Sequence, residues 1–458
     1  MSLPDNSDEM PRPVADAMRL DDPPTQSGSV ARMLVAGVVC AALLALLVLR
    51  GLPAAISETA PRVALKLDPN QPGASLALAE ADVEDIAKKV AARLASTGAN
   101  TFGPTGLDAA DKETLAQTKS RLENALDANG GGPKANRLRG QIAELEGDLK
   151  SAETFMRAAV RGSIRETRAV YWLFARSAET GDGASALGLA DTLLRTSRRS
   201  VNLVAPVLAR IVEGRPDGVD QIASVFATNP PWRTQVFLAM LAHMTDPRTP
   251  VAILVALKGS KPKQDELSAC LNFLVSKGRY DLAYFTWLQF LSDTELGRHG
   301  LVYNGGFQTP FSGSPFDWVV HRGFGAMVAV VPRTGKEGEK ALFVEFGQGR
   351  VDFGGVVQVL MLGPGKYRVH GEQRGELQGR RGLRWRLSCL GQRPTVLGQS
   401  DMLMGDVPSW SPFEYFITVP PEGCAAQSLQ LILDARTQSE TMVRGRAWFN
   451  GVSVTGVP

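Results

Sequence analysis

The chain has 458 residues, a formal net charge of +3 at pH 7, four cysteines and 44% hydrophobic residues. Because domains usually contain about 100 to 200 residues, this length predicts more than one domain. A net charge this small over this length argues against a nucleic-acid-binding protein, which needs a concentrated basic surface.

The N-terminal segment combines an acidic tail with an apolar run. Residues 1–31 contain six acids, two bases and five prolines, a composition typical of a disordered tail. Seventeen uncharged residues follow, Met33 to Leu49, between Arg32 and Arg50. We expect a transmembrane helix over residues 32–54, because this run nearly spans the hydrocarbon core and arginines at both ends reach the lipid headgroups.

A cleaved signal peptide, with Leu52-Pro53-Ala54 as its cleavage site, is the alternative, although secretory signals begin with a basic segment. The bases on the two sides of the span nearly balance, so the positive-inside rule does not decide the orientation. We expect the tail to stay in the cytoplasm and the C-terminal region to lie in the periplasm, because long domains cross membranes largely regardless of charge. The chain is then a single-pass protein of the inner (cytoplasmic) membrane.

Residues 60–297 are predicted to be helical, because alanine and leucine recur there at helical spacing. The pair Gly147-Asp148 recurs as Gly181-Asp182, an offset of 34 residues, and a third copy begins at Gly278. Small residues follow at matching positions. The full set of predicted packing positions is Gly140, Gly147, Ala152, Ala159, Gly181, Ala186, Gly278 and Ala283.

This spacing resembles that of a tetratricopeptide repeat, a pair of helices that repeats every 34 residues. The resemblance implies a helical solenoid that binds protein partners along a groove and has no catalytic groups of its own. The middle of the region fits the pattern poorly, because Gly214 misses the register by one residue and Pro206 interrupts a helix. An irregular helical bundle with a chance glycine offset is the alternative.

Glycine becomes much more frequent after residue 300, with 24 glycines in the last 158 residues against 22 in the first 300. Such turn-dense composition is typical of β-structure. Hydrophobic and polar residues alternate in runs such as 383–389, as in strands with one buried face, and this alternation places Trp385 in the core. We expect roughly eight strands over residues 301–458, forming a two-sheet sandwich or jelly roll.

The two ends of this segment carry a more specific pattern. Residues 301–308 (LVYNGGFQ) open it and residues 447–454 (AWFNGVSV) close it. These motifs resemble the galactose-binding-like jelly rolls of carbohydrate-binding modules. Acids near both ends of such domains lie close to a structural calcium site in many members, whereas this chain has Gln308 and Asn450-Gly451 there. Because calcium prefers several carboxylate or carbonyl oxygens, we expect no bound calcium.

A basic segment offers candidate ligand contacts. Residues 366–393 contain eight bases and two acids, which form either a solvated sheet face or a cationic platform for an anionic glycan or lipid head group. Alternation places Arg384 and Arg386 on the same face of one strand, and Arg368 joins them if its strand is adjacent.

Two aromatic residues complete the predicted binding site. Trp410 lies between two serines in a proline-bearing segment that is predicted to be a loop, which makes it a candidate to stack on a sugar ring. Tyr415 fits either the core or the binding site. The glycan-binding candidates are therefore Trp410, Tyr415, Arg368, Arg384 and Arg386.

The sequence contains no zinc-ligand spacing, phosphate loop or nucleophile elbow. We therefore expect no catalytic residues, cofactor or metal. Cys389 and Cys424 are the two cysteines of the predicted sandwich. We expect them to form a disulfide in an oxidising compartment, with two buried thiols as the alternative.

Together these patterns predict a multidomain protein with a single N-terminal transmembrane helix, all-α tetratricopeptide-like helical repeats and an all-β jelly-roll sandwich. The resemblance to bacterial envelope proteins of this organisation implies a non-catalytic role in surface polysaccharide assembly or export. Its partners are then the membrane, proteins bound by the helical repeats, and an acidic polysaccharide, without nucleic acid. A protein-assembly scaffold whose sandwich binds no sugar is the alternative, and a glycan-active enzyme is the third hypothesis.

Overall fold

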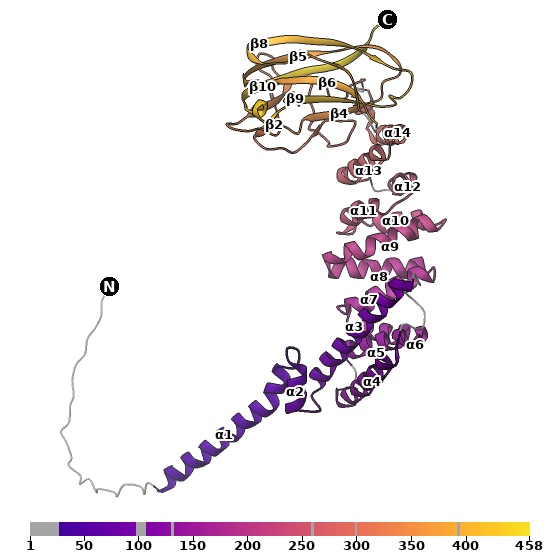
Figure 1. The fold of residues 1–458 in the computed structure, drawn as a ribbon, viewed down its shortest axis with the longest axis vertical. Helices are drawn as coiled ribbons and strands as arrows, with labels where there is room; N and C mark the ends of the chain where they lie inside the picture. The colour runs from indigo at the N-terminus through magenta and orange to yellow at the C-terminus, as the bar shows by residue number, and fades with distance from the viewer. Residues whose placement is uncertain (1–26, 98–106, 130–131, 258–260, 298–299, 392–393) are drawn as a thin grey trace, which may run out of the picture. The chain divides into compact units, whose positions relative to one another are not determined.

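The computed structural model describes residues 27–97, 107–129, 132–257, 261–297, 300–391 and 394–458. The chain divides into two compact units, residues 1–166 and 167–458. The first is helical, and the second contains helices followed by two β-sheets (Figure 1). The predicted helical region, residues 60–297, therefore extends over both units. Most of the predicted acidic tail, residues 1–26, lies outside the described residues.

The first unit begins with α1, Ser27–Ala55. Met33–Ala55 is the one helical stretch among the described residues that is long and apolar enough to cross a membrane, and none of its apolar window is buried. A helix that exposes apolar side chains all round is unlike the half-buried helix of a soluble domain. Its length and composition fit a membrane span, and its position near the N-terminus fits a signal sequence equally well.

The rest of the first unit packs around the apolar faces of three helices. Ile86 and Leu122 are almost inaccessible to solvent in its core. Beside this core, the buried Arg137 guanidinium bonds the carboxylates of Glu80 and Glu166 at 2.7 and 2.8 Å. The described helices after α1 are α2 (Pro61–Leu67), α3 (Pro72–Thr97), α4 (Ala109–Asn129), α5 (Pro133–Leu145) and α6 (Leu149–Gly162).

The second unit begins with short helices that pack against their neighbours along the chain. Apolar residues at helical spacing, such as Leu208, Phe226 and Phe237, are fully buried between them. These helices are α7 (Thr167–Glu179), α8 (Gly183–Thr196), α9 (Val201–Gly214), α10 (Gly218–Ala227), α11 (Arg233–Leu241), α12 (Arg248–Val255), α13 (Gln264–Ser276), α14 (Tyr280–Phe290) and α15 (Asp293–Leu296), with a 3₁₀ turn, η1 (Arg198–Ser200), before α9.

The recurring glycines occupy the same kind of turn in three helix pairs. Gly147, Gly181 and Gly278 have φ angles of 84°, 79° and 69°, a left-handed conformation that glycine adopts without a side-chain clash. After the first two, Asp148 and Asp182 accept a hydrogen bond from the backbone N–H three residues on, which caps the next helix. The 34-residue offset therefore corresponds to a repeated turn between helices.

The other predicted packing positions also lie in tight contacts. A β-carbon on Gly140 would approach Met156 to 2.9 Å, so the two helices meet closely there. The predicted alanines, Ala152, Ala159, Ala186 and Ala283, are all fully buried. Membership in the tetratricopeptide family stays a prediction.

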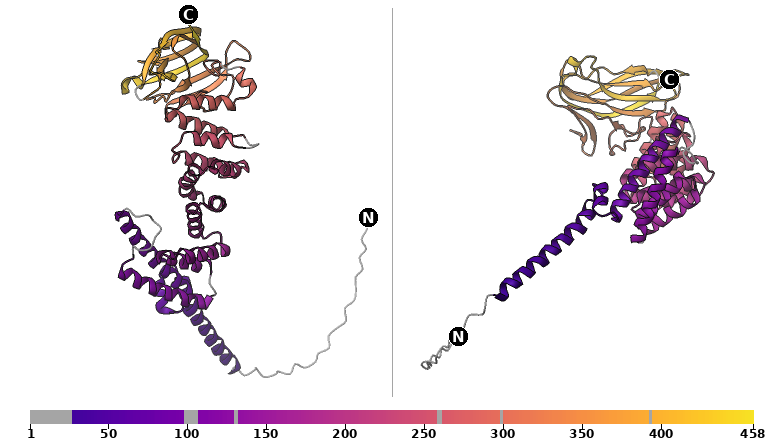
Figure 2. Two further views of the ribbon diagram at one scale, coloured as in Figure 1. Left: turned by 90° about the vertical axis from the view of Figure 1, so that its right-hand side faces the viewer. Right: turned by 60° about the horizontal axis from the view of Figure 1, so that its bottom comes forward.

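The second unit ends in a sandwich of two antiparallel five-stranded sheets (Figure 1, Figure 2). One sheet has the order β1-β4-β9-β6-β7 and the other β2-β3-β10-β5-β8. The described residues of the sandwich form ten strands, where we expected about eight. Their bounds are β1 (Val319–Val320), β2 (Ala326–Pro332), β3 (Lys340–Phe346), β4 (Val356–Leu360), β5 (Gly365–Gly379), β6 (Leu383–Cys389), β7 (Thr395–Gln399), β8 (Gly405–Val419), β9 (Gln427–Leu433) and β10 (Val443–Gly456), with a 3₁₀ turn, η2 (Gln438–Thr441), before β10.

Aromatic side chains fill the space between the two sheets. Trp385 lies in this core, as its alternation with leucines predicts, and its ring centroid is 5.5 Å from that of Trp318. Phe413 stacks on Trp385 from the opposite sheet, with 14° between the ring planes. This arrangement is an all-β jelly-roll sandwich.

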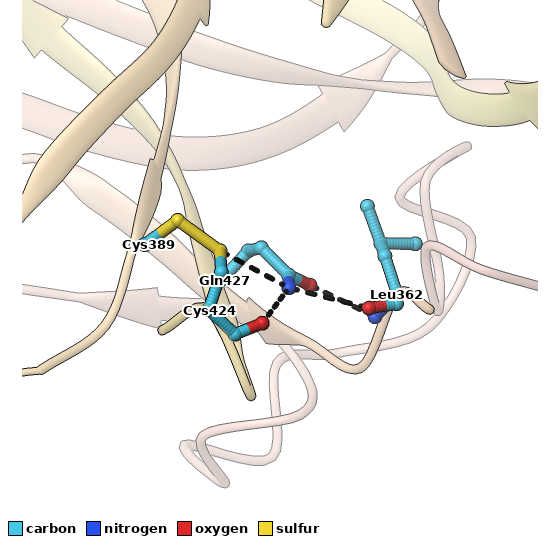
Figure 3. Close-up of a disulfide and its surroundings, with 4 residues drawn as sticks. All are labelled: Leu362, Cys389, Cys424 and Gln427. Carbon is cyan, nitrogen blue, oxygen red and sulfur yellow. Dashed lines mark hydrogen bonds between the residues drawn. A yellow bond between two sulfur atoms is a disulfide. The ribbon is translucent and has the colours of Figure 1, made fainter. Parts of the chain in front are cut away.

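A disulfide links Cys389 at the end of β6 to Cys424 in the loop before β9 (Figure 3). The two Cα atoms are 5.1 Å apart, within the usual range for a disulfide. Beside it, the buried Gln427 side chain accepts a hydrogen bond from the Leu362 N–H and donates to the Cys424 carbonyl, at 2.8 and 2.9 Å. The disulfide and this amide together join three segments at one end of the sandwich.

Within the second unit, the last long helices pack directly on the sandwich. On α14, Trp287 contacts Tyr303 and Phe316 with ring centroids 5.1 and 5.5 Å apart. On α13, Gln264 donates hydrogen bonds to Ser312 and Ser314 of the sandwich at 3.1 Å. These aromatic and polar contacts hold the helices and the sandwich together.

Candidate functional site

The predicted arginines do not form one platform. Arg384 and Arg386 leave the same face of β6, but both guanidinium groups bond one carboxylate, that of Asp434, at 3.3 and 3.0 Å. Arg368 lies on β5, in the other sheet, where it faces Glu414 at 3.7 Å. The condition for Arg368 to join the other two, adjacency of its strand, is not met, because β5 and β6 are consecutive in sequence but belong to different sheets. Arg393, also in the basic segment, lies outside the described residues.

Trp410 lies in strand β8, so the expectation of a loop was wrong. The guanidinium carbon of Arg333 lies 4.4 Å above its ring centroid, so a protein cation already covers one ring face. Its flanking serines and prolines are accommodated because β8 is an edge strand with a shifted register near this point.

Tyr415 is buried between the sheets and belongs to the hydrophobic core. Burial raises the pKa of its phenol well above the ordinary value. Of the two alternatives left open by the sequence, the core is therefore correct, and Tyr415 is inaccessible to a ligand.

The outer face of the sheet β2-β3-β10-β5-β8 carries a different set of aromatic and charged side chains. Register pairs Ala329 with Phe343, Phe343 with Trp448, and Trp448 with Arg374, so these four residues form a row across four strands. The alternate residues of the same strands, such as Leu342, are fully buried in the core. The row therefore points away from the core.

In Phe343, Trp448 and Arg374, which we call the aromatic row, Trp448 contacts the other two side chains. The ring centroids of Phe343 and Trp448 are 5.2 Å apart, and the Arg374 guanidinium carbon lies 5.3 Å from the centroid of Trp448. All three side chains are partly exposed. They form a continuous surface of flat groups with apolar area and hydrogen-bond donors at its rim.

A charged row runs beside the aromatic row. Register aligns Glu345, Arg446 and Glu376 on β3, β10 and β5. The Arg446 guanidinium donates to the Glu345 carboxylate at 2.8 Å. Both signs of charge therefore lie next to the aromatic row, where they offer donors and acceptors to a polar ligand.

The loop between β2 and β3 bounds the aromatic row on its other side. Its first residue, Arg333, extends across the sheet and bonds Glu339 of the loop, Glu372 of β5 and Asn450 of β10, at 3.0, 2.7 and 3.1 Å. Only 4% of the Arg333 side chain is exposed. The loop is thereby fixed on the outer face.

The described residues contain no group of three or more histidine, cysteine or acidic residues placed to hold a metal ion. The two positions tied to calcium in the resembling family bond the protein itself. Gln308 donates to the Gly306 carbonyl at 2.7 Å, and Asn450 bonds Arg333 and the Lys340 carbonyl. The absence of calcium stays a prediction.

One serine and one histidine meet on the same outer face, with Ser453 Oγ 3.0 Å from His370 Nε2. The other ring nitrogen, Nδ1, is buried and has no hydrogen-bond partner among the described residues. The nearest carboxylate in register, that of Glu414, faces Arg368 instead. A third group that orients the histidine, as a serine nucleophile requires, is therefore missing from this pair.

Sequence reasoning missed the aromatic row. Alternation along β3 and β10 places Phe343 and Trp448 opposite the core residues, and that local signal was present. The sequence does not show the register that places Phe343 of β3, Trp448 of β10 and Arg374 of β5 side by side.

No protein-family model and no curated protein matches the chain. Solved structures that are similar to about a third of it include carbohydrate-binding modules, a putative sugar-binding protein and the enzymatically active domain of a bacteriophage tailspike protein. They include a CBM4 module (13% identity, covering 34% of this chain and 99% of the module, TM-score 0.25) and a CBM61 module in complex with β-1,4-galactotriose (17%, 35% and 99%, TM-score 0.24). A putative sugar-binding protein from Bacteroides thetaiotaomicron matches at 10% identity, covering 35% of this chain and 100% of that one, with a TM-score of 0.27. TM-scores this low carry no argument about function.

Proposed function

We propose that this chain is a non-catalytic envelope protein that binds a glycan on the outer face of the sheet β2-β3-β10-β5-β8. The observation that carries the proposal is the aromatic row. Flat aromatic rings provide apolar area for the C–H faces of sugar rings, and the charged row beside them provides partners for hydroxyl groups. Because this face carries both Arg446 and Glu345, neutral and acidic glycans are both candidates.

The test is binding of the full chain to a panel of neutral and acidic polysaccharides by affinity electrophoresis, followed by calorimetry with the best ligand. Trp448→Ala is expected to weaken binding by about tenfold or more, because a central aromatic contact dominates such interfaces. Its melting temperature should change little, since the side chain is partly exposed.

Phe416→Ala is the matched control. Phe416 is 62% exposed on the same outer face, in register with Arg368 and away from the aromatic row. The variant should bind like the native chain. Equal binding by Trp448→Ala, or no binding to any glycan of the panel, would contradict the proposal.

A protein-assembly scaffold whose sandwich binds no sugar remains the second candidate. The observation in its favour is that neither aromatic residue predicted to bind a sugar is free to do so. Arg333 covers one face of Trp410, and Tyr415 lies in the core. The same panel separates the two functions. A glycan-active enzyme is not proposed, because the Ser453 and His370 pair lacks an orienting group among the described residues.

The proposal includes a protein-binding role for the helices and a setting in surface polysaccharide assembly or export. It is supported by the turns at Gly147 and Gly181, whose 34-residue offset matches the spacing of tetratricopeptide-like repeats, and by the same left-handed turn at Gly278. Repeats of that kind bind protein partners along an extended surface. The polysaccharide setting comes from resemblance at the level of fold and is an analogy.

We further propose that α1 spans the inner membrane once, with residues 1–31 cytoplasmic and residues 56–458 periplasmic. The disulfide between Cys389 and Cys424 supports this orientation, because disulfides persist in oxidising compartments. Alkaline phosphatase fused after Pro458 should be active in cells, and a reporter that fluoresces only in the cytosol should be dark there. The reverse pattern, or a mature chain without α1, would refute this topology.

A further inference from the structure

Strand β2 forms an edge of the sandwich whose only protection is Pro332 at its last position. It pairs with β3 in seven consecutive positions, from Ala326 with Phe346 to Pro332 with Lys340, without a register shift. Its other edge pairs with no strand among the described residues of the second unit. The residues from Ala326 to Val331 (AMVAVV) contain no charged or polar side chain. Proteins usually protect such edges with charges, prolines, bulges or short strands.

The other three edge strands carry these protections. Strand β1 has two residues. Strand β7 has a register shift where it pairs with β6, and β8 has one where it pairs with β5, together with prolines and exposed acids such as Asp406 and Glu414. The contrast marks β2, whose single proline stands at its last position, as the least protected edge of the two sheets within the described residues.

A hollow of about 450 Å³, lined by apolar side chains and by Lys340 of β3, lies along β2. Val328 and Val330 line it from the strand, and Phe311 and Val320 line it from neighbouring segments. Val320, Phe324 and Met327 add exposed apolar area at the same side of the sandwich. A regular, uncharged strand edge beside an apolar hollow is the arrangement that strand addition uses, because the backbone provides hydrogen bonds and the hollow accepts alternate side chains.

We propose that β2 pairs with β2 of a second copy of this chain, antiparallel and centred on Ala329. In this register Val328 faces Val330 of the other copy and Met327 faces Val331, so every cross-strand pair is apolar and no charges oppose one another. Pairs of β-branched residues stabilise antiparallel sheets. The contact is self-complementary and closes into a twofold dimer in which two sheets become one. It does not depend on the proposed glycan binding.

The test uses the full chain purified in detergent, with its mass measured by sedimentation velocity. The native chain is expected to be a dimer in equilibrium with the monomer. Met327→Lys should raise the dissociation constant by about tenfold or more, because twofold symmetry introduces the charge twice at an apolar contact. Val396→Lys is the matched control, since Val396 is 52% exposed on edge strand β7 and Met327 is 50% exposed, and it should leave the dimer unchanged.

A cross-linking experiment locates the contact directly. In a chain with Cys40→Ser, which removes the exposed thiol of α1, Ala329→Cys should give a disulfide-linked dimer on mild oxidation. Val396→Cys in the same background should stay uncross-linked. A native chain that stays monomeric, a dimer that Met327→Lys leaves intact, or cross-linking of the Val396→Cys chain in place of the Ala329→Cys chain would each overturn the proposal.

Discussion

Replacing Glu266 by alanine is expected to lower the free energy of unfolding of the second unit's helices by about 3 to 5 kcal/mol. The Glu266 carboxylate lies 2.5 Å from the Arg233 guanidinium, and each side chain is 1% exposed. It also accepts hydrogen bonds from the Thr234 hydroxyl and the Lys263 N–H at 2.9 and 3.0 Å. Its removal leaves a buried cation without its carboxylate and the first turn of α13 without this cap. Thermal melting and hydrogen exchange of α11 and α13 measure the loss.

The control is Glu153→Ala, which removes an exposed pair with Arg157 on α6. Glu153→Ala should change the free energy of unfolding by no more than about 0.5 kcal/mol, because exposed ion pairs contribute little to stability. A double variant, Arg233→Met with Glu266→Leu, should be less destabilised than Glu266→Ala, since no buried charge remains. If Glu266→Ala melts and exchanges like Glu153→Ala, the buried pair does not hold α11 to α13.

Features that depend on local periodicity could be predicted from the sequence. The apolar run gave α1, the alanine and leucine spacing gave a helical region, and the alternation around Trp385 gave a core strand. The glycine offset identified a turn that recurs in the structure. A left-handed φ angle strongly favours glycine at one position, so the turn is visible in the sequence. These signals need no knowledge of which segments meet in space.

Features that depend on strand register could not be predicted. Arg384 and Arg386 looked like a free cationic pair because Asp434 is 48 residues from Arg386 in sequence, yet its carboxylate bonds both. Arg333 reaches Asn450, 117 residues away, from a loop that gave no sequence signal. The aromatic row likewise exists only once β3, β10 and β5 are adjacent. Cross-strand neighbours are set by topology, and local alternation says only which face a residue takes.

Trp410 shows how a local signal misleads. Serines and prolines around it are typical of a loop, but β8 is an edge strand, and an edge strand tolerates proline because one side of its backbone needs no partner in the sheet. The Arg333 guanidinium, from a distant part of the sequence, packs on the Trp410 ring and covers one of its faces. The serines and prolines of a segment therefore indicate that its backbone tolerates irregularity. They do not indicate whether its side chains are exposed.

Replacing Cys389 and Cys424 by serine together is expected to lower the free energy of unfolding of the sandwich by roughly 3 to 4 kcal/mol. The disulfide joins residues 35 apart in sequence, and the loop that it closes restricts the unfolded chain. Denaturant unfolding followed by tryptophan fluorescence includes the signals of Trp318 and Trp385 in the sandwich core beside those of tryptophans in the helices. Cys40→Ser, at an exposed thiol outside the sandwich, should leave that transition in place.

Reduction of the native chain separates the cross-link from the packing of the sulfur atoms. A reducing agent should shift the sandwich transition of the native chain to lower denaturant and leave the double serine variant unmoved, because that variant has no bond to break. The denatured native chain should contain two reactive thiols, those of Cys40 and Cys270. Four thiols, or an equal response of both proteins to reduction, would mean that Cys389 and Cys424 are two buried thiols. The sandwich would then rest on its aromatic core and the Gln427 hydrogen bonds alone at this end, and the argument from the disulfide for a periplasmic location would fall with it.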